Sequence, residues 1–283
     1  KKVYNVSNKP HKLIFILYEG MKLFIFEGKK REPRIFKTIQ WLYFTENDQL
    51  IFSFCNNIHN LYKELHDVFE GDGDIVSVLR ESAIQRGDHS LDEITTSSDV
   101  SEIYLFFDYD FQEKTVDLDV MNQHVKDMLA FFNDETDNGK LFINYPMVES
   151  LRCTNELQDA NYNSYVVTRK ECCDFKNYVT KKFPFYKNLD FAVFQLDQDG
   201  NIKIQSLESE EKIRINWTLI NAQNIAKASF LCDVNEKTPS VEDISQKEIF
   251  DNQLSKYVSN EPSEVSILNS FPLFLYEYFG ESV

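Results

Sequence analysis

The sequence predicts an α/β fold, in which helices flank a mostly parallel sheet and a mainly helical C-terminal region follows. Two observations lead to this fold class. Short apolar runs alternate with stretches whose apolar residues recur at helical spacing. The apolar runs are continuous, which is typical of strands in a parallel sheet that is covered on both faces.

Composition limits the classes of protein to consider. The 283 residues, 42% of them hydrophobic, are enough for a substantial core, and only 8 Gly and 7 Pro argue against a low-complexity chain. We expect no membrane contact, because no apolar run approaches the roughly 20 residues of a membrane span. No signal peptide is recognisable, and the five cysteines have no disulfide or zinc spacing. We therefore expect reduced thiols and a cytoplasmic location.

The first half of the chain supplies the strands and helices of the expected sheet. Two β-prone runs, 12–17 and 22–26, come first, and Glu32-Pro33 then opens a helix because Pro is accommodated in the first turn. The next expected elements are a strand at 49–55, a helix at about 57–69, a helix at 75–82 capped by Asp74, a polar loop at 85–101 with one short helix, a strand at 102–107, a helix at about 121–133 and a strand at 141–144.

The pattern changes after about residue 150. We therefore divide the chain into residues 1–150, with a helical insertion at about 57–100, and residues 151–283, an α+β and mainly helical region for partner or substrate contacts. The expected elements of the second part are helices at 172–182 and 213–233, a small hairpin formed by 191–196 and 202–204, and an apolar helix at 267–279 that is broken near Pro272.

Acidic residues follow two of the expected strands at the point where each strand ends. Glu27 follows the run 22–26, and Asp108 and Asp110 follow the run 102–107. Open parallel sheets place their sites at the carboxyl ends of strands, and alternate residues of a strand point the same way. Mg²⁺ is usually held by one or two carboxylates together with substrate phosphates. The sequence therefore predicts a site for Mg²⁺ or Mn²⁺ that serves phosphodiester chemistry, with Glu27, Asp108 and Asp110 as catalytic residues.

Three segments, taken in order, resemble a known family. They are Phe24-Ile-Phe-Glu27-Gly28-Lys-Lys-Arg-Glu32-Pro33-Arg-Ile35-Phe36, Tyr104-Leu-Phe-Phe-Asp108-Tyr-Asp110 and Phe142-Ile-Asn-Tyr-Pro146-Met-Val-Glu149. The combination is similar to the TOPRIM domains of the RloB and AriB group of bacterial anti-phage proteins. The resemblance implies a TOPRIM-like domain over 1–150 in which Glu27, Asp108 and Asp110 bind metal. Glu32 and Glu149 are further candidates for metal binding or for supporting the ligands.

The sequence departs from the family pattern in two places. Arg31 stands where many relatives have Thr, and the interval from Glu27 to Asp108 is long, which the helical insertion must accommodate.

The resemblance also implies a function. It implies a metal-dependent endonuclease, a toxic effector of abortive infection that an ABC-type ATPase sensor restrains or activates. The segment Phe271–Phe279 looks more like the AriB-type effectors, which implies transfer RNA as the substrate, although DNA stays open. Whether the protein forms a homodimer is also open. The alternative is a non-catalytic partner or inhibitor subunit in which the same fold is a scaffold.

A second glutamate competes for the role of Glu27. Glu19-Gly20 also follows an apolar run, but only Glu27 is followed by a basic run and Glu32-Pro33, so we prefer Glu27. The basic run supplies the candidates for substrate binding, Lys29, Lys30, Arg31 and Arg34, although a solvated helix face would have the same pattern. A weaker second patch consists of Lys176, Lys181, Lys182 and Lys187. The net charge of −16 argues against indiscriminate nucleic-acid binding and suits docking on a basic partner.

Overall fold

A computed structural model describes residues 20–45, 47–65, 73–184, 194–196, 202–204, 210–236, 238–280 and 283. Its centre is a five-stranded sheet with the strand order β2-β1-β3-β5-β4. The strands are β1 (Lys22–Phe26), β2 (Leu50–Phe54), β3 (Glu102–Asp108), β4 (Asn133–Asp134) and β5 (Gly139–Asn144). All neighbouring pairs are parallel except β4 with β5 at one edge. The α/β class with a mostly parallel sheet is therefore confirmed.

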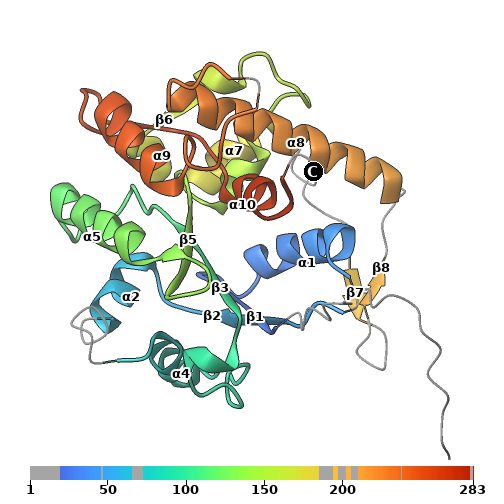
Figure 1. Ribbon diagram of the computed structural model, residues 1–283. Coiled ribbons are helices and arrows are strands. Elements are labelled where there is room, and N and C mark those ends of the chain that lie inside the picture. The colour runs from blue at the N-terminus through green and yellow to red at the C-terminus, as the bar shows by residue number, and fades with distance from the viewer. Residues whose placement is uncertain are drawn as a thin grey trace, which may run out of the picture.

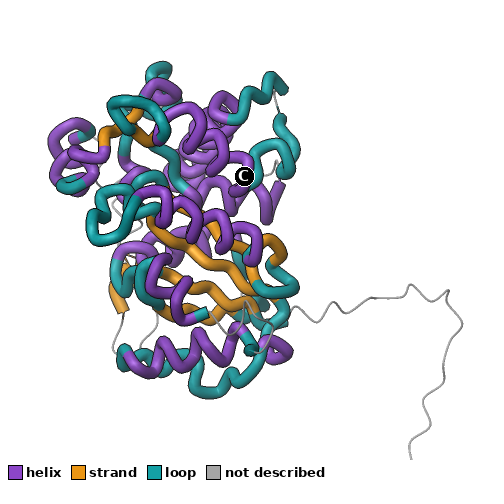
Figure 2. Tube along the Cα trace, turned by 90° about the vertical axis from the view of Figure 1, so that its left-hand side faces the viewer, coloured by secondary structure: helices purple, strands orange, loops and turns teal. Residues whose placement is uncertain are grey.

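Helices cover both faces of this sheet (Figures 1 and 2). In Figure 1, α1 (Arg31–Tyr43) lies above the sheet and α4 (Ile75–Gln85) lies below it. The other helices of this half are α2 (Ile58–Glu64), α5 (Leu118–Phe131) and the 3₁₀ turn η1 (Ser97–Asp99). Asp74 caps α4 by accepting the Ser77 N–H at 3.0 Å, as predicted. The expected strand at 12–17 and Glu19 lie outside the described residues.

The C-terminal region is mainly helical, as predicted. Its helices are α6 (Arg169–Cys172), α7 (Phe175–Lys182), α8 (Glu210–Leu231), α9 (Gln246–Gln253) and α10 (Ser270–Phe279), with the 3₁₀ turns η2 (Val148–Arg152) and η3 (Tyr162–Ser164) and the π-helical turn η5 (Leu254–Val258). Two antiparallel strand pairs accompany them, β6 (Val166–Thr168) with β9 (Glu264–Ser266) and β7 (Phe194–Leu196) with β8 (Ile202–Ile204). None of the described helices is long and apolar enough to cross a membrane.

One expected feature of this region is wrong. Pro272 does not break the last helix, because it lies in the first turn of α10, where its missing N–H would have no partner within the helix. Asn269 precedes the helix and caps it by accepting the Phe271 N–H at 3.1 Å. The apolar residues before Asn269 are extended instead, and Leu268 pairs with Tyr145.

The core runs without a break across residue 150. On one face of the sheet the rings of Phe26, Phe106 and Phe142 form a row, with centroids 5.6 Å and 5.4 Å apart. Phe271 of α10 stacks on Phe106 at 4.8 Å. Phe274, one turn further along α10, contacts the same row. The C-terminal region therefore covers one face of the sheet that carries the predicted site.

Candidate active site

Glu27 and Asp108 lie side by side at the carboxyl edge of the sheet. Glu27 directly follows β1, and Asp108 is the last residue of the neighbouring parallel strand β3. The Glu27 Oε2 atom accepts a hydrogen bond from the Asp108 backbone N–H at 3.1 Å. The order of strands and the continuous apolar runs are sufficient to bring these two carboxylates together.

Asp108 is buried and organises the chain that follows β5. Its Oδ1 atom accepts hydrogen bonds from Asn144 Nδ2 at 3.1 Å and from the Val148 N–H at 2.9 Å. The Asn144 Oδ1 atom in turn accepts from the N–H and the hydroxyl of Ser270, the first residue of α10. Asp108 is thus connected to both η2 and the last helix, and Oδ2 takes part in neither bond.

Asp110 has a left-handed backbone, with φ of 55°. Such a conformation is uncommon for a residue other than Gly and is frequent at functional sites. Its Oδ1 atom accepts a hydrogen bond from Gln112 Nε2 at 2.8 Å. Tyr109, between the two aspartates, is fully buried and stacks against Phe111, so the two aspartates flank a residue that anchors the loop in the core.

Glu32 and Glu149 complete the group. Glu32 lies in the first turn of α1 and is 6% exposed, and a Cβ atom at Gly28 would lie only 2.6 Å from its Oε2 atom. A side chain at position 28 would therefore displace the Glu32 carboxylate. Glu149, on η2, is 4% exposed, and its Oε2 atom is buried without a hydrogen-bond partner among the described residues.

Electrostatic interactions connect these five residues. Burial raises the pKa of Asp108 well above its usual range, and Glu27, Glu32, Asp110 and Glu149 raise it further. Burial and then Asp110 likewise raise the pKa of Glu27, whereas the Asp108 N–H lowers it. Burial also raises the pKa of Glu32 and of Asp110. We call Glu27, Glu32, Asp108, Asp110 and Glu149 the carboxylate cluster.

The carboxylate cluster fits a hard divalent cation by its donor chemistry. Its ligand atoms are all carboxylate oxygens, which Mg²⁺ and Mn²⁺ prefer. Burial and the acidic neighbours oppose the charged forms of Glu27 and Asp108, and a bound cation would favour those forms. The buried Glu149 Oε2 atom, which has no hydrogen-bond partner among the described residues, is also available to bind a cation. In the part of the chain that the structure describes, no three such side chains are already arranged around one point. Glu27 and Asp108 instead direct one oxygen each to the hydrogen bonds described above.

Two cations contact the carboxylate cluster. Arg31 Nε and Lys176 Nζ lie 3.4 Å and 3.7 Å from Glu149 Oε1. Lys176 also lowers the pKa of Glu27 and of Glu32, although burial still dominates both. Lys176 belongs to α7, far along the chain from the basic run that follows Glu27. The sequence showed it only as one member of a weak lysine patch, of which Lys187 lies outside the described residues.

The other predicted substrate-binding residues are placed differently. Lys29 Nζ donates to the Arg86 carbonyl at 2.9 Å, at the C-terminal end of α4. Lys30 and Arg34 are exposed at the start of α1. Asn144 was missed from the sequence, although its place at the end of β5, on the same sheet edge, is a signal that could have found it.

Comparisons of this chain with protein-family models, curated proteins and solved structures find no match.

Proposed function

We propose that this protein is a nuclease that depends on Mg²⁺ or Mn²⁺ and cleaves phosphodiester bonds at the carboxylate cluster. The observation that carries the proposal is the pairing of Glu27 with Asp108 at the carboxyl edge of a parallel sheet, where Glu32, Asp110 and Glu149 are near enough to raise the pKa of Asp108. The motif resemblance to TOPRIM nucleases supports it independently of the geometry.

Each group has a defined task in this proposal. Glu27, Asp108 and Asp110 bind the metal, and Glu32 and Glu149 bind it or hold its ligands in place. A bound divalent ion supplies polarisation of the scissile phosphate and activation of water. Arg31 and Lys176 attract the phosphates of the incoming strand, exchanging their contacts with Glu149 for contacts with substrate oxygens.

The wider role rests on the resemblance. We infer a cytoplasmic effector of anti-phage abortive infection, with transfer RNA favoured over DNA as substrate and with an ABC-type ATPase as its sensor. The net charge of −16 supports docking on a basic protein surface.

The test compares purified wild type with Asp108→Ala and with Asp137→Ala, an exposed carboxylate outside the cluster. Each protein is incubated with transfer RNA, single-stranded RNA or plasmid DNA in the presence of Mg²⁺, Mn²⁺ or EDTA. We expect metal-dependent cleavage by wild type and Asp137→Ala and none by Asp108→Ala. If wild type alone cleaves none of the substrates, the same variants are co-expressed with a candidate ABC-type ATPase partner. Toxicity that survives Asp108→Ala would exclude the proposed site and favour the non-catalytic partner subunit.

Lys176 allows a finer test. We expect Lys176→Ala to raise KM about 3–10-fold and to weaken its salt dependence, because one phosphate contact is lost. Lys181→Ala, an exposed lysine on the same helix, is the matched control and should behave as wild type. Equal effects of the two variants would show that Lys176 acts only through the general charge of α7.

A further inference from the structure

The outward face of α8 is apolar over about four helical turns. It consists of Ile215, Leu219, Ala222, Ala226 and Phe230, which we call the α8 stripe. At about 3.6 residues per turn, these positions fall within an arc of about 80°. Leu219 is half-buried and the others are exposed, Ile215 by 52% and Phe230 by 53%. The outward face of a surface helix normally carries charged residues, so this face is suited to contact with another surface.

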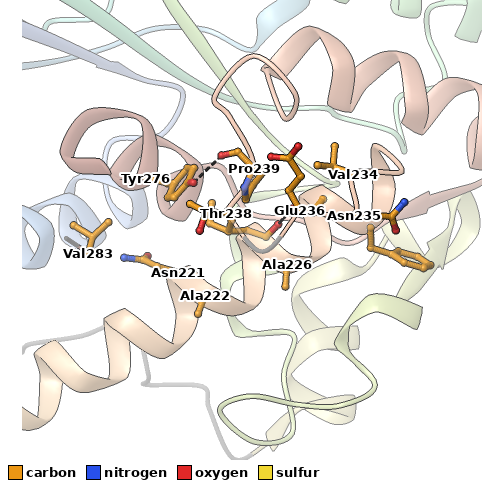
Figure 3. Close-up of a pocket in the computed structure, with 13 residues that line it drawn as sticks. Asn221, Ala222, Ala226, Val234, Asn235, Glu236, Thr238, Pro239, Tyr276 and Val283 are labelled. Atoms are coloured by element: carbon orange, nitrogen blue, oxygen red, sulfur yellow. Dashed lines mark hydrogen bonds between the residues drawn. The ribbon is translucent and has the colours of Figure 1, made fainter. Parts of the chain in front are cut away.

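A cavity of about 490 Å³ lies beside the α8 stripe (Figure 3). Ala222, Ala226 and Phe230 belong both to the stripe and to the lining of the cavity. The lining also includes Pro239 and Tyr276, and the Tyr276 hydroxyl donates to the Pro239 carbonyl at 2.8 Å. The cavity therefore widens the apolar surface to one side of α8.

The spacing of the α8 stripe is self-complementary. A two-fold axis that passes through the middle of α8, between residues 222 and 223, would place a second copy of the helix antiparallel to the first. Ile215 and Phe230 are equally far along the chain from this axis, and so are Leu219 and Ala226. Ile215 would therefore face Phe230 of the partner subunit, and Leu219 would face a small side chain. Ala222 lies next to the axis, where its small side chain lets the two helices approach closely.

Charges at the two ends of α8 favour the same arrangement. Lys212 and Asp233 are also equally far from the axis, so each of these lysines would face an aspartate of the other copy. Asp233 pairs with Lys256 of its own chain at 2.6 Å, and its side chain is still 79% exposed. Glu210, at the same end as Lys212, is paired with Arg214 at 3.1 Å. The net charge of −16 opposes association of two copies in general, so they would meet through a surface that is itself uncharged.

We propose that the α8 stripe is the interface of a two-fold, antiparallel dimer of this chain. A stripe about 22 Å long on one helix supplies less area than the roughly 800 Å² per partner of a standard interface. The dimer is therefore weak, with a Kd of about 10–100 µM. The proposal does not depend on nuclease activity, because the α8 stripe and the carboxylate cluster have no residue in common.

Sedimentation velocity of the full-length protein at about 5–300 µM, in reducing buffer, measures the equilibrium between monomer and dimer. Ala226→Glu and Ile215→Glu place a charge at exposed positions of the α8 stripe. Ala130→Glu, at an exposed position of α5, is the matched control. We expect the first two variants to raise the dimer Kd at least about tenfold and the control to leave it unchanged. Thermal melts verify that each variant is folded.

Two charge reversals test the antiparallel arrangement. Lys212→Glu alone, or Asp233→Lys alone, would place like charges opposite each other, and each should raise the Kd about 3–10-fold. A mixture of the two variants should regain the wild-type affinity, because every facing pair in the mixed dimer is again of opposite charge. In a parallel dimer each position would face itself, so neither single variant would weaken it.

Three outcomes would overturn the proposal. A monomer throughout the concentration range would leave the α8 stripe to a different protein. A dimer that persists unchanged in Ala226→Glu and Ile215→Glu would place the interface elsewhere. Single charge reversals without effect on the Kd would exclude the antiparallel arrangement.

Discussion

Asp108 is a buried carboxylate whose charged form is opposed by its surroundings, first by burial and then by its acidic neighbours. Its pKa is therefore higher in the folded than in the unfolded chain, and the folded state binds its proton more tightly. The free energy of unfolding that depends on this group is consequently highest at low pH. It falls as the pH rises from the usual aspartate range, near about 4, through the raised pKa of the folded state.

Asp108→Asn should therefore stabilise the protein while abolishing cleavage. We expect an increase of about 1–2 kcal/mol in the free energy of unfolding at neutral pH, because the charge is removed and the amide oxygen can still accept from Asn144 and Val148. Urea unfolding in EDTA at about pH 5 and about pH 7.5 measures it, and the gain should be larger at the higher pH. Asp137→Asn, an exposed control, should change little. A loss of stability at both pH values would contradict this account of Asp108.

Lys227 is a buried lysine on α8. Its Nζ atom donates to the carbonyls of Tyr162 and Tyr165 at 2.9 Å and 2.7 Å. Burial lowers its pKa to about 7, and nearby Cys153 opposes that shift. The unfolded chain, with an ordinary lysine pKa, binds more protons above pH 7. Stability that depends on Lys227 therefore rises from about pH 7 towards the normal lysine pKa near about 10.4.

Lys227→Met should remove that rise and lower stability throughout, because the two carbonyls lose their donor. Wild type and variant are compared by urea unfolding at several pH values between about 7 and 8.5. We expect the stability difference to grow by about 1 kcal/mol per pH unit. Parallel pH profiles would show that Lys227 stays protonated in the folded state as it does in the unfolded state.

At the scale of elements, helix α10 packs against one face of the sheet. Phe271 and Phe274 contact the row of strand rings, two of which Phe36 of α1 also contacts. Phe271→Ala should lower the free energy of unfolding by about 3–5 kcal/mol, as for other large-to-small changes in a core. Phe230→Ala, on an exposed position of α8, should cost less than about 0.5 kcal/mol. Chemical denaturation of both variants measures the contrast, and similar losses would mean that α10 contributes little to the core.

The sequence predicts those helices and strands that have a recognisable pattern within a few consecutive residues. Strands β1, β3 and β5 are continuous apolar runs, and α1 combines helical spacing with Pro33 in its first turn. The strand pair β6 and β9 was not predicted, because each strand has three residues and the partners are far apart in the chain. Helix α9 was missed as well, since its sequence is largely polar.

Among the residues of the candidate site, too, only those with a local sequence signal could be predicted. Glu27, Asp108 and Asp110 follow strands, so their positions are set by the sheet and could be inferred from the sequence. Glu149 and Lys176 reach the candidate site from η2 and α7, which are separate elements of the chain. The spacing of residues in the sequence does not predict that these two side chains contact each other. Such contacts depend on the packing of the whole chain.

At the scale of the whole molecule, the sheet and the C-terminal region are one structural unit. The boundary near residue 150 marks a change of sequence pattern, yet α10 covers the sheet and Ser270 is bonded to Asn144, the partner of Asp108. A change in the packing of α10 would therefore reach the carboxylate cluster through two hydrogen-bonded side chains.

The same continuity predicts how fragments behave. Residues 1–150 alone would expose the aromatic row of Phe26, Phe106 and Phe142, and Asn144 would lose its bonds to Ser270. We expect this fragment to be insoluble or to lack a cooperative thermal transition, and co-expression with residues 151–283 to restore one. Circular dichroism of the fragment, the pair and the intact chain provides the measurement. A cooperative melt of residues 1–150 alone, near that of the intact chain, would instead show that the sheet is stable without α10, and the hydrogen-bonded route through Asn144 would then be dispensable for folding.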